Sequence, residues 1–285
     1  MLGHDVVAEA NAVHHEVVAL TREGLDVTDY DAVATRFERE LPAVVINCAA
    51  WTDVDGAEAR EDDAFAINAD GAGNVSAAAA HIGARIIHIS TDYVFNGDKR
   101  EPYVESDPVG ALGAYGRTKL AGEEQVAMNN PRHLIVRTSW LYGLGGKNFV
   151  ETMLSLAEKQ NEILVVADQY GCPTYSRELA GALVELIDFE RLGVMHICGE
   201  GVTTWYDFAR EIFRQSQSEV SVLSGVTAML DRPAPRPLNS AMVSERDDAP
   251  RLPRWDHGLH AYLLARTARE SIERQTTGEE VEIQE

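Results

Sequence analysis

The sequence predicts an α/β protein with a doubly wound, Rossmann-type parallel sheet and a smaller C-terminal substrate-binding lobe. Apolar runs of strand length alternate with segments of helical spacing through the first half of the chain, which is the pattern of βαβ units. One run, residues 43–50 (AVVINCAA), is apolar without interruption, as is typical of a strand buried on both faces of a parallel sheet. Right-handed crossovers then place the helices on both sides of the sheet.

The first half divides into alternating elements. The chain opens in a pattern typical of a helix that is already under way. The elements predicted after it are strands at 15–20 and 25–29, a helix at 29–40, the strand at 43–50, and two Ala-rich helical pieces within 58–81, broken near 70–73. A strand at 85–90, a loop containing Pro102 and Pro108, a helix carrying Tyr115 and Lys119, and a strand at 133–140 follow.

The alternation loosens after the glycine-rich residues 143–146. The elements predicted there are a helix at 148–160, a strand at 163–167, a helix at 176–188, a strand at 194–198 and a helix at 204–215. Residues 231–237 (DRPAPRP) are too proline-rich for either class, and the acidic tail beyond Thr276 is expected to fray. We therefore expect a dinucleotide-binding domain at 1–147 and a mainly substrate-binding lobe at 148–285, with some segments returning to the sheet.

The charge balance excludes two classes of partner. The chain has 46 Asp and Glu against 25 Lys and Arg, a net charge of −21. Nucleic acid and anionic membranes would be repelled by such a field. Lysine is also scarce, at Lys99, Lys119, Lys147 and Lys159. An acidic, lysine-poor composition is typical of proteins that work in concentrated salt, so we expect a halophilic source; a merely soluble acidic protein is the alternative.

The sequence indicates less strongly where the protein is located and what its cysteines do. No apolar run approaches the length of about 20 residues that crosses a bilayer, and the opening residues resemble no signal peptide, so a cytoplasmic protein is expected. Cys48, Cys172 and Cys198 lack the paired spacing of a zinc site. We expect small buried residues at all three positions and no metal.

Tyr115 and Lys119 are the candidate acid–base pair. Residues four apart on a helix lie on the same face. A free phenol has a pKa of about 10, and a nearby ammonium lowers it toward working pH. This spacing alone also fits a solvated helix face. Thr91, at the end of the strand at 85–90, supplies a hydroxyl that would meet the same carbonyl group.

Strand ends hold the other candidates, because ligands of open parallel sheets bind beyond the carboxyl ends of the strands. Three ends carry polar or aromatic residues: 47–53 (NCAAWTD), 90–93 (STDY) and 138–142 (TSWLY). The small side chains of Ala49 and Ala50 would let a flat cofactor approach the backbone. Packing against a neighbouring helix explains them equally well.

These residues resemble a known family, the dTDP-4-dehydrorhamnose reductases among the extended short-chain dehydrogenase/reductases. The resemblance runs over nearly the whole chain. It rests on seven blocks in family order: 25–29 (LDVTD), 47–55 with Glu58, 90–95 (STDYVF), 115–123 (YGRTKLAGE), 137–143 (RTSWLYG), 168–174 (DQYGCPT) and 236–240 (RPLNS).

The resemblance implies the roles of individual residues in reducing the C4 ketone of a nucleotide-linked 4-keto-6-deoxy sugar. Tyr115 would donate the proton, Lys119 would tune it and bind the cofactor ribose, and Thr91 would hydrogen-bond the carbonyl. The implied substrate contacts are Thr91, Asp92, Tyr93 and Trp140. The implied cofactor contacts are Gly3, Arg22, Asp26, Val27, Ala49, Ala50, Trp51, Tyr115 and Lys119. Arg22 suits a 2′-phosphate, which favours NADPH over NADH, although an exposed Arg without a ligand explains it nearly as well.

Other activities of the same fold stay open to different degrees. A 4,6-dehydratase of this superfamily uses an Asp-Glu pair after the Thr, and Tyr93 cannot act as that carboxylate, which disfavours elimination. An epimerase and a reductase of another sugar nucleotide are not excluded. A regulatory subunit of methionine adenosyltransferase shares the fold without catalysis, but the intact set of Thr91, Tyr115 and Lys119 weighs against it. The oligomeric state is open, a homodimer included.

The chain departs from the family at its start. The family begins with a strand and a G-x-x-G-x-x-G turn that holds the pyrophosphate, and Gly3 matches only the last glycine. The absent strand lies mid-sheet, and each buried backbone group left unpaired costs on the order of 1–3 kcal/mol. We therefore expect Met1 to be an internal methionine of a longer protein, which the upstream coding sequence tests.

Overall fold

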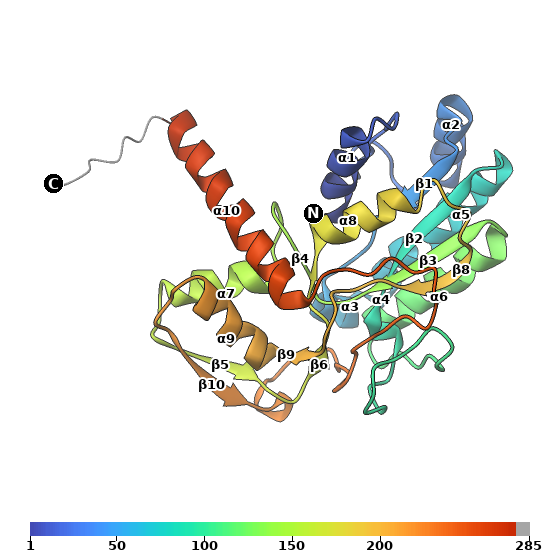
Figure 1. Ribbon diagram of the computed structural model, residues 1–285. Helices are drawn as coiled ribbons and strands as arrows, with labels where there is room; N and C mark the ends of the chain where they lie inside the picture. The colour runs from blue at the N-terminus through green and yellow to red at the C-terminus, as the bar shows by residue number, and fades with distance from the viewer. Residues whose placement is uncertain (278–285) are drawn as a thin grey trace.

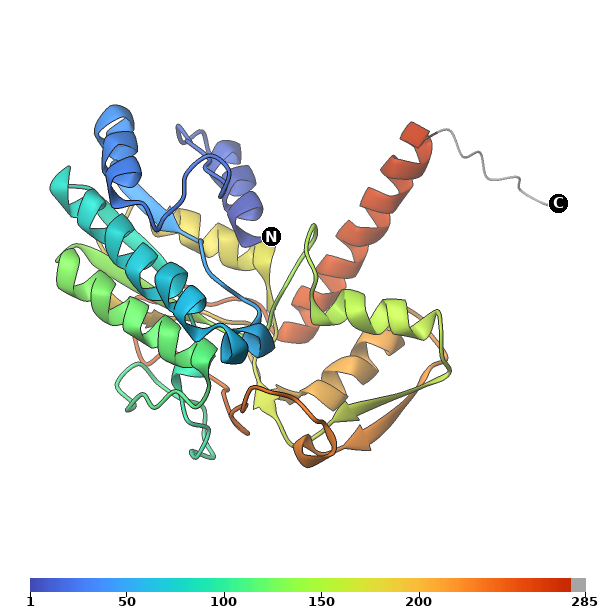
Figure 2. The same cartoon turned by 180° about the vertical axis from the view of Figure 1, so that it is seen from behind.

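The computed structural model describes residues 1–277 and consists of a three-layer core with a second lobe beside it (Figures 1 and 2). The central sheet is parallel, in the order β1-β2-β3-β8. Its strands are β1 (Val44–Asn47), β2 (Arg85–Thr91), β3 (His133–Thr138) and β8 (Gly193–His196). Helices cover both faces of this sheet, so the predicted doubly wound parallel sheet is confirmed.

Each face of the sheet has its own apolar core. On one face lie α1 (Leu2–Ala12) and α8 (Ser176–Glu185), which bury Val6 and Leu183 against Val136. On the other face lie α2 (Tyr30–Glu40), α5 (Gly71–His81) and α6 (Ala114–Asn129). Removing these apolar side chains from water is the main term that holds the layers together. The helices predicted at the start of the chain, at 29–40 and around Tyr115 are confirmed.

The connection from β1 to β2 differs from its prediction. It contains α3 (Val54–Ala59), α4 (Glu61–Phe65) and a π-helical turn η1 (Ala66–Asp70) that runs into α5. The break lies at Arg60, with φ −137°, and the predicted break near 70–73 is wrong. Gly71 does not interrupt the helix; it lets Val27 pack closely, since a Cβ there would lie 2.7 Å from Val27 Cγ2.

The strands predicted at 15–20 and 25–29 are wrong. Residues 15–20 pair with no strand within residues 1–277, and Val18 and Leu20 are exposed. A strand forms only beside a neighbour that completes its hydrogen bonds. At 25–29, Asp26 accepts hydrogen bonds from the N–H and the hydroxyl of Thr28 at 3.0 and 2.8 Å, a local turn that competes with a strand. Strand β1 is the outer strand of the sheet and is only half-buried on most of its length, not buried on both faces as predicted.

The second lobe is built mainly from the chain after residue 148 (Figure 2). Its elements are α7 (Phe149–Ala157), β5 (Glu162–Val166), α9 (Trp205–Gln215), β10 (Ser221–Gly225) and the start of α10 (Trp255–Thr277). They enclose an apolar core that includes Phe208 and Tyr262. The predicted helices at 148–160, 176–188 and 204–215 and strands at 163–167 and 194–198 are confirmed in shorter form, and β10 and α10 were not predicted. The acidic tail expected to fray lies, from residue 278 on, outside the described residues.

Four short strands and two 3₁₀ turns complete the described structure. The strand pairs are β4 (Leu141–Tyr142) with β7 (Thr174–Tyr175) and β6 (Tyr170–Gly171) with β9 (Thr203–Thr204). The turns are η2 (Asp92–Val94) and η3 (Thr227–Met229). Within residues 1–277, no helix combines the length and the apolar character needed to span a membrane. All three cysteines are free; Cys172 is buried as predicted, whereas Cys48 and Cys198 are half-buried.

Candidate active site

Thr91 and Tyr115 meet where β2 ends and α6 begins. Thr91 is the last residue of β2 and caps the turn η2, accepting a hydrogen bond from the N–H of Tyr93 at 3.2 Å. Tyr115 lies in the first turn of α6, and its phenol is close enough to the Thr91 side chain for that side chain to act on the pKa of Tyr115. The structure thus brings together a strand-end hydroxyl and a helical phenol that the sequence singled out separately.

The phenol of Tyr115 is held in its protonated form. Burial raises the pKa of Tyr115 to about 12, aided by the charge of Asp92 and opposed by the hydrogen bond with Thr91. Lys119 is not among the groups that shift this pKa, so the expected lowering by a neighbouring ammonium is wrong for the protein as it stands. A buried phenol of this kind is a proton donor rather than a base.

The amine of Lys119 is buried against β2. The side chain is 2% exposed, and its Nζ donates to the carbonyl of Ile89 at 2.6 Å. The same Nζ lies 3.3 Å from Nε2 of His88. Burial lowers the pKa of Lys119 to about 8, while the charges of Glu123 and Cys48 oppose the shift.

Asp92 is buried beside Thr91 and is held by two hydroxyls. It accepts hydrogen bonds from Thr91 Oγ1 at 3.0 Å and from Ser240 Oγ at 2.5 Å. Burial raises the pKa of Asp92 to about 7. Its carboxyl group therefore changes charge near neutral pH.

Replacing Asp92 by Asn is expected to stabilise the fold at pH 8 more than at pH 5. The carboxyl pKa is about 3.9 in an unfolded chain and about 7 in the folded one. The stability that comes with its proton is complete below the unfolded value and is lost as pH rises through 7. About three pKa units set an upper limit of roughly 4 kcal/mol on the gain from Asn at pH 8. Thermal unfolding at pH 5, 6.5 and 8 measures it, with exposed Asp62→Asn as control; a gain independent of pH would contradict the prediction.

Arg236, in the proline-rich segment, and Ser240, just after it, also belong to this cluster. Neither was predicted as a site residue. Arg236 donates to both carboxylate oxygens of Asp55, at 3.1 and 2.8 Å, and lies close to the side chain of Tyr93. The ring of Tyr93 in turn lies edge-on to that of Tyr115, with centroids 5.7 Å apart. Arg236 and Ser240 could have been identified from the unusual composition of the segment around them, which fits neither a helix nor a strand.

Trp140 comes from the end of β3 and lies against the second lobe. Its ring stacks on Trp205 of α9, with centroids 3.4 Å apart and planes 5° from parallel. A Cβ at Gly171 would lie 2.2 Å from the Trp140 ring, so only glycine fits there. The backbone of Trp140 has φ 45°, a left-handed conformation that is uncommon for a large residue and that aims the ring at the lobe.

The residues expected at a cofactor separate into two groups. Ala49 is exposed at the carboxyl end of β1, its N–H bound to Asn47 Oδ1 at 3.1 Å, and Trp51 follows, half-buried. The first turn of α1 opens at this point, because a Cβ at Gly3 would lie 3.8 Å from the Cβ of Cys48. The second group, Arg22, Asp26 and Val27, lies in the turn after residue 20; the first two are exposed and Val27 packs on α5.

The carboxyl end of β1 has the openness that part of a bound dinucleotide requires. Ala49 and Ala50 leave the backbone accessible at the carboxyl end of β1, and the N–H groups of a helix N-terminus face the same place. Lys119 is near this group, since its charge acts on Cys48. Within residues 1–277, no three side chains of metal-binding type gather as a metal site would require.

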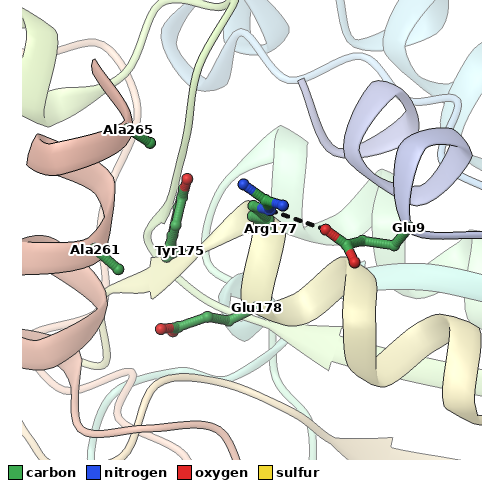
Figure 3. Close-up of a pocket in the computed structure, with 6 residues that line it drawn as sticks. All are labelled: Glu9, Tyr175, Arg177, Glu178, Ala261 and Ala265. Atoms are coloured by element: carbon green, nitrogen blue, oxygen red, sulfur yellow. Dashed lines mark hydrogen bonds and ion pairs between the residues drawn. The ribbon is translucent and has the colours of Figure 1, made fainter. Parts of the chain in front are cut away.

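A separate hollow lies between α1, α8 and α10, away from these residues (Figure 3). It is lined by Glu9, Tyr175, Arg177, Glu178, Ala261 and Ala265. Arg177 forms an ion pair with Glu9 across it, at 2.9 Å. Burial raises the pKa of Glu178 to about 7. None of the residues expected at a sugar or a dinucleotide lines this hollow.

A family model described as the RmlD substrate binding domain matches residues 1–267. A dTDP-4-dehydrorhamnose reductase of Mycobacterium tuberculosis is 41% identical over 283 residues, covering 96% of this chain and 92% of its own. A crystal structure of a dTDP-4-dehydrorhamnose reductase from Clostridium acetobutylicum is 41% identical with a TM-score of 0.91, covering 93% of this chain and 96% of that one. One from Bacillus anthracis, solved in complex with NADP, is 37% identical with a TM-score of 0.90, covering 93% and 95%.

Proposed function

The chain belongs to the RmlD substrate-binding-domain family of keto-sugar reductases, and from this we propose that it reduces the C4 ketone of a nucleotide-linked 4-keto-6-deoxy sugar with NADPH. The proposed substrate is dTDP-4-dehydrorhamnose and the product dTDP-L-rhamnose. The observation that carries the proposal is the placing of Tyr115, in the first turn of α6, beside Thr91 at the end of β2, in a chain that matches such reductases over nearly their full length. A relative complexed with NADP favours NADPH as the cofactor.

NADPH, when bound, supplies the hydride that reduces the ketone. We propose that Lys119 and Tyr115 hold its ribose and that Ala49, Ala50 and Trp51, with Gly3 in the first turn of α1, line its other half. Arg22, Asp26 and Val27 are proposed to complete the adenosine end. In this division residues 1–147 hold the cofactor, and residues 148–285 mainly hold the sugar nucleotide, with Trp140 and Tyr93 against the sugar.

Tyr115 is suited to give its proton to the ketone oxygen as that oxygen gains negative charge. With a pKa of about 12, its phenol is protonated at any working pH, and an alkoxide is basic enough to take the proton. Thr91 orients the same oxygen by a hydrogen bond. When Asp92 is protonated it can itself donate to Thr91 Oγ1, which leaves the Thr91 hydroxyl free to donate to the substrate.

The direct test is NADPH oxidation by the purified chain with dTDP-4-dehydrorhamnose, followed at 340 nm in low and in high KCl. Turnover with this ketone and none with dTDP-glucose, which has no ketone to reduce, is expected. Substituting NADH measures the cofactor preference. Absence of turnover at every salt concentration would contradict the proposal and favour a non-catalytic relative of the same fold.

We also propose that the protein works in a cytoplasm of high salt. Free cysteines without a disulfide in residues 1–277 fit a reducing compartment. The net charge of −21 with four lysines fits concentrated salt. A homodimer is proposed as the assembly, and light scattering of the purified chain measures it.

Raising KCl from 0.1 to 2 M is expected to raise the melting temperature. At low salt the excess carboxylates repel one another over the whole fold, and screening removes this repulsion because the Debye length falls from about 10 Å at 0.1 M to about 3 Å at 1 M. Differential scanning calorimetry in KCl measures the effect, with a neutral osmolyte at equal osmolality as control. A melting temperature that is the same in all KCl concentrations would contradict it.

A further inference from the structure

Three buried polar side chains form a chain behind the candidate active site. They come from three elements: Asn47 ends β1, His88 lies in β2 and Lys119 lies in α6. They are 6%, 0% and 2% exposed. Asn47 Nδ2 lies 3.2 Å from His88 Nδ1, and His88 Nε2 lies 3.3 Å from Lys119 Nζ. The imidazole thus links an amide on one side to the lysine amine on the other.

The direction of the hydrogen bonds fixes the tautomer of His88. The backbone N–H of Ala49 donates to Asn47 Oδ1 at 3.1 Å, so the amide of Asn47 must present its Nδ2, a donor, to the ring. Nδ1 of His88 therefore accepts. Burial and the charge of Lys119 hold the pKa of His88 well below its usual value, so the ring is neutral and carries its one proton on Nε2.

A proton on Nε2 of His88 decides whether Lys119 is charged or neutral. The Nε2–H group donates toward Nζ, and an amine accepts only when it is neutral. An ammonium at Lys119 would require the opposite tautomer, whose Nδ1–H would face the Nδ2–H of Asn47. The ring in this tautomer therefore disfavours the charged form of Lys119.

The other groups around Lys119 act in both directions. Burial disfavours its charge, while Glu123 on the same helix and Cys48 after β1 favour it. Glu123 is itself bound by Arg137 of β3 at 2.9 and 2.7 Å. The amine also keeps the Ile89 carbonyl as an acceptor at 2.6 Å in either state. His88 is the neighbour whose hydrogen bond depends on the charge of Lys119.

We propose that His88 is a positioning residue that, with its tautomer fixed by Asn47, holds Lys119 and sets the pH at which this lysine changes charge. The inference rests on the proposed function only for its effect on turnover. After Tyr115 has given up its proton, a protonated Lys119 nearby stabilises the phenolate and a neutral one does not. His88 thereby determines the pH range over which Tyr115 regains its proton and the site is ready for another turnover.

The scarcity of lysine makes a direct test practical. Lysine labelled at Cε and Nζ gives four signals from the whole chain, and Lys119→Met identifies the one that matters. No substrate or cofactor is needed. In wild type the Lys119 signal is expected to titrate near pH 8, and in His88→Gln, whose carboxamide oxygen can accept from an ammonium, at a pH higher by about one unit. His81→Gln, on the exposed end of α5, is the matched control and is expected to leave the midpoint unchanged.

Two further measurements keep the inference falsifiable if His88→Gln folds poorly. The ¹⁵N chemical shifts of the His88 ring in wild type are expected to show the proton on Nε2. In Asn47→Asp the new carboxylate accepts a hydrogen bond from Nδ1–H of His88, which moves the ring proton from Nε2 to Nδ1. The titration midpoint of Lys119 is then expected to rise. A wild-type ring protonated on Nδ1, or a Lys119 midpoint that stays the same in both variants, would overturn the inference. A shifted midpoint in a chain without turnover would support it while the proposed function fails.

Discussion

Tyr115→Phe is expected to lower kcat by about 10²–10⁴-fold with little change in KM, because a positioned proton donor contributes rate enhancements of this size. The substitution removes one hydroxyl and keeps the ring that packs edge-on against Tyr93. The loss corresponds to roughly 3–5 kcal/mol of transition-state stabilisation. Thr91 keeps its hydrogen bonds with Asp92 and with the N–H of Tyr93.

The measurement is initial-rate NADPH oxidation at saturating ketone, with the melting temperature checked in parallel. Tyr30→Phe on α2 is the matched control, since that side chain is exposed and belongs to a different helix from Tyr115, and we expect it to match wild type. A Tyr115→Phe enzyme within tenfold of wild type would show that another group, or water, donates the proton.

Glu123→Gln is expected to destabilise the fold by about 3–5 kcal/mol, because it leaves a buried guanidinium without its counter-charge. Glu123 accepts two hydrogen bonds from Arg137 and one from Ser90 Oγ at 2.5 Å. The side chains of Glu123 and Arg137 are each 6% exposed. The pair joins α6 to β2 and β3, so its loss affects the layer that carries Tyr115.

Urea unfolding gives the free energy of unfolding for this variant. The next residue provides the control: Glu124 is exposed on the same helix, and Glu124→Gln is expected to change stability by less than about 0.5 kcal/mol. The double variant Glu123→Leu with Arg137→Met, which removes both charges, is expected to be more stable than Glu123→Gln alone. A Glu123→Gln protein as stable as the control would mean that the pair contributes nothing.

Much of the fold could be predicted from local sequence patterns, and the elements that were predicted wrongly share a common cause. The strands at 85–90 and 133–140 were predicted from the short apolar runs that they contain, and both are buried over most of their length. The segment 15–20 is equally apolar, yet whether it pairs depends on what lies beside it, and this is not encoded in its own residues. Helix α10 was missed because its outer part is stabilised by surface ion pairs such as Arg266–Glu270 rather than by an apolar stripe.

Some residues of the candidate site could likewise be predicted from local pattern, and others could not. Thr91 and Tyr115 were accessible from the sequence because each lies at the junction of a strand or helix with a loop. The direction of Lys119 was not, because helical spacing gives the face of a side chain and not the partner it finds there. His88 was overlooked since a histidine within an apolar strand most simply packs in the core. Ser240 reaches Asp92 from 148 positions away, a contact that only the tertiary fold creates.

The outer edge of β1 has a consequence for how copies of the protein meet. Within residues 1–277 the strand is paired on one side only, and the nearby segment exposes Val13, Val18 and Leu20. An open edge beside apolar side chains is a template onto which a strand of another molecule can add. In dilute salt, mutual repulsion between molecules of charge −21 keeps such edges apart, and salt shortens the range of that repulsion. The salt that stabilises the fold therefore also lets these edges approach one another, and concentrated stocks are best kept at intermediate ionic strength.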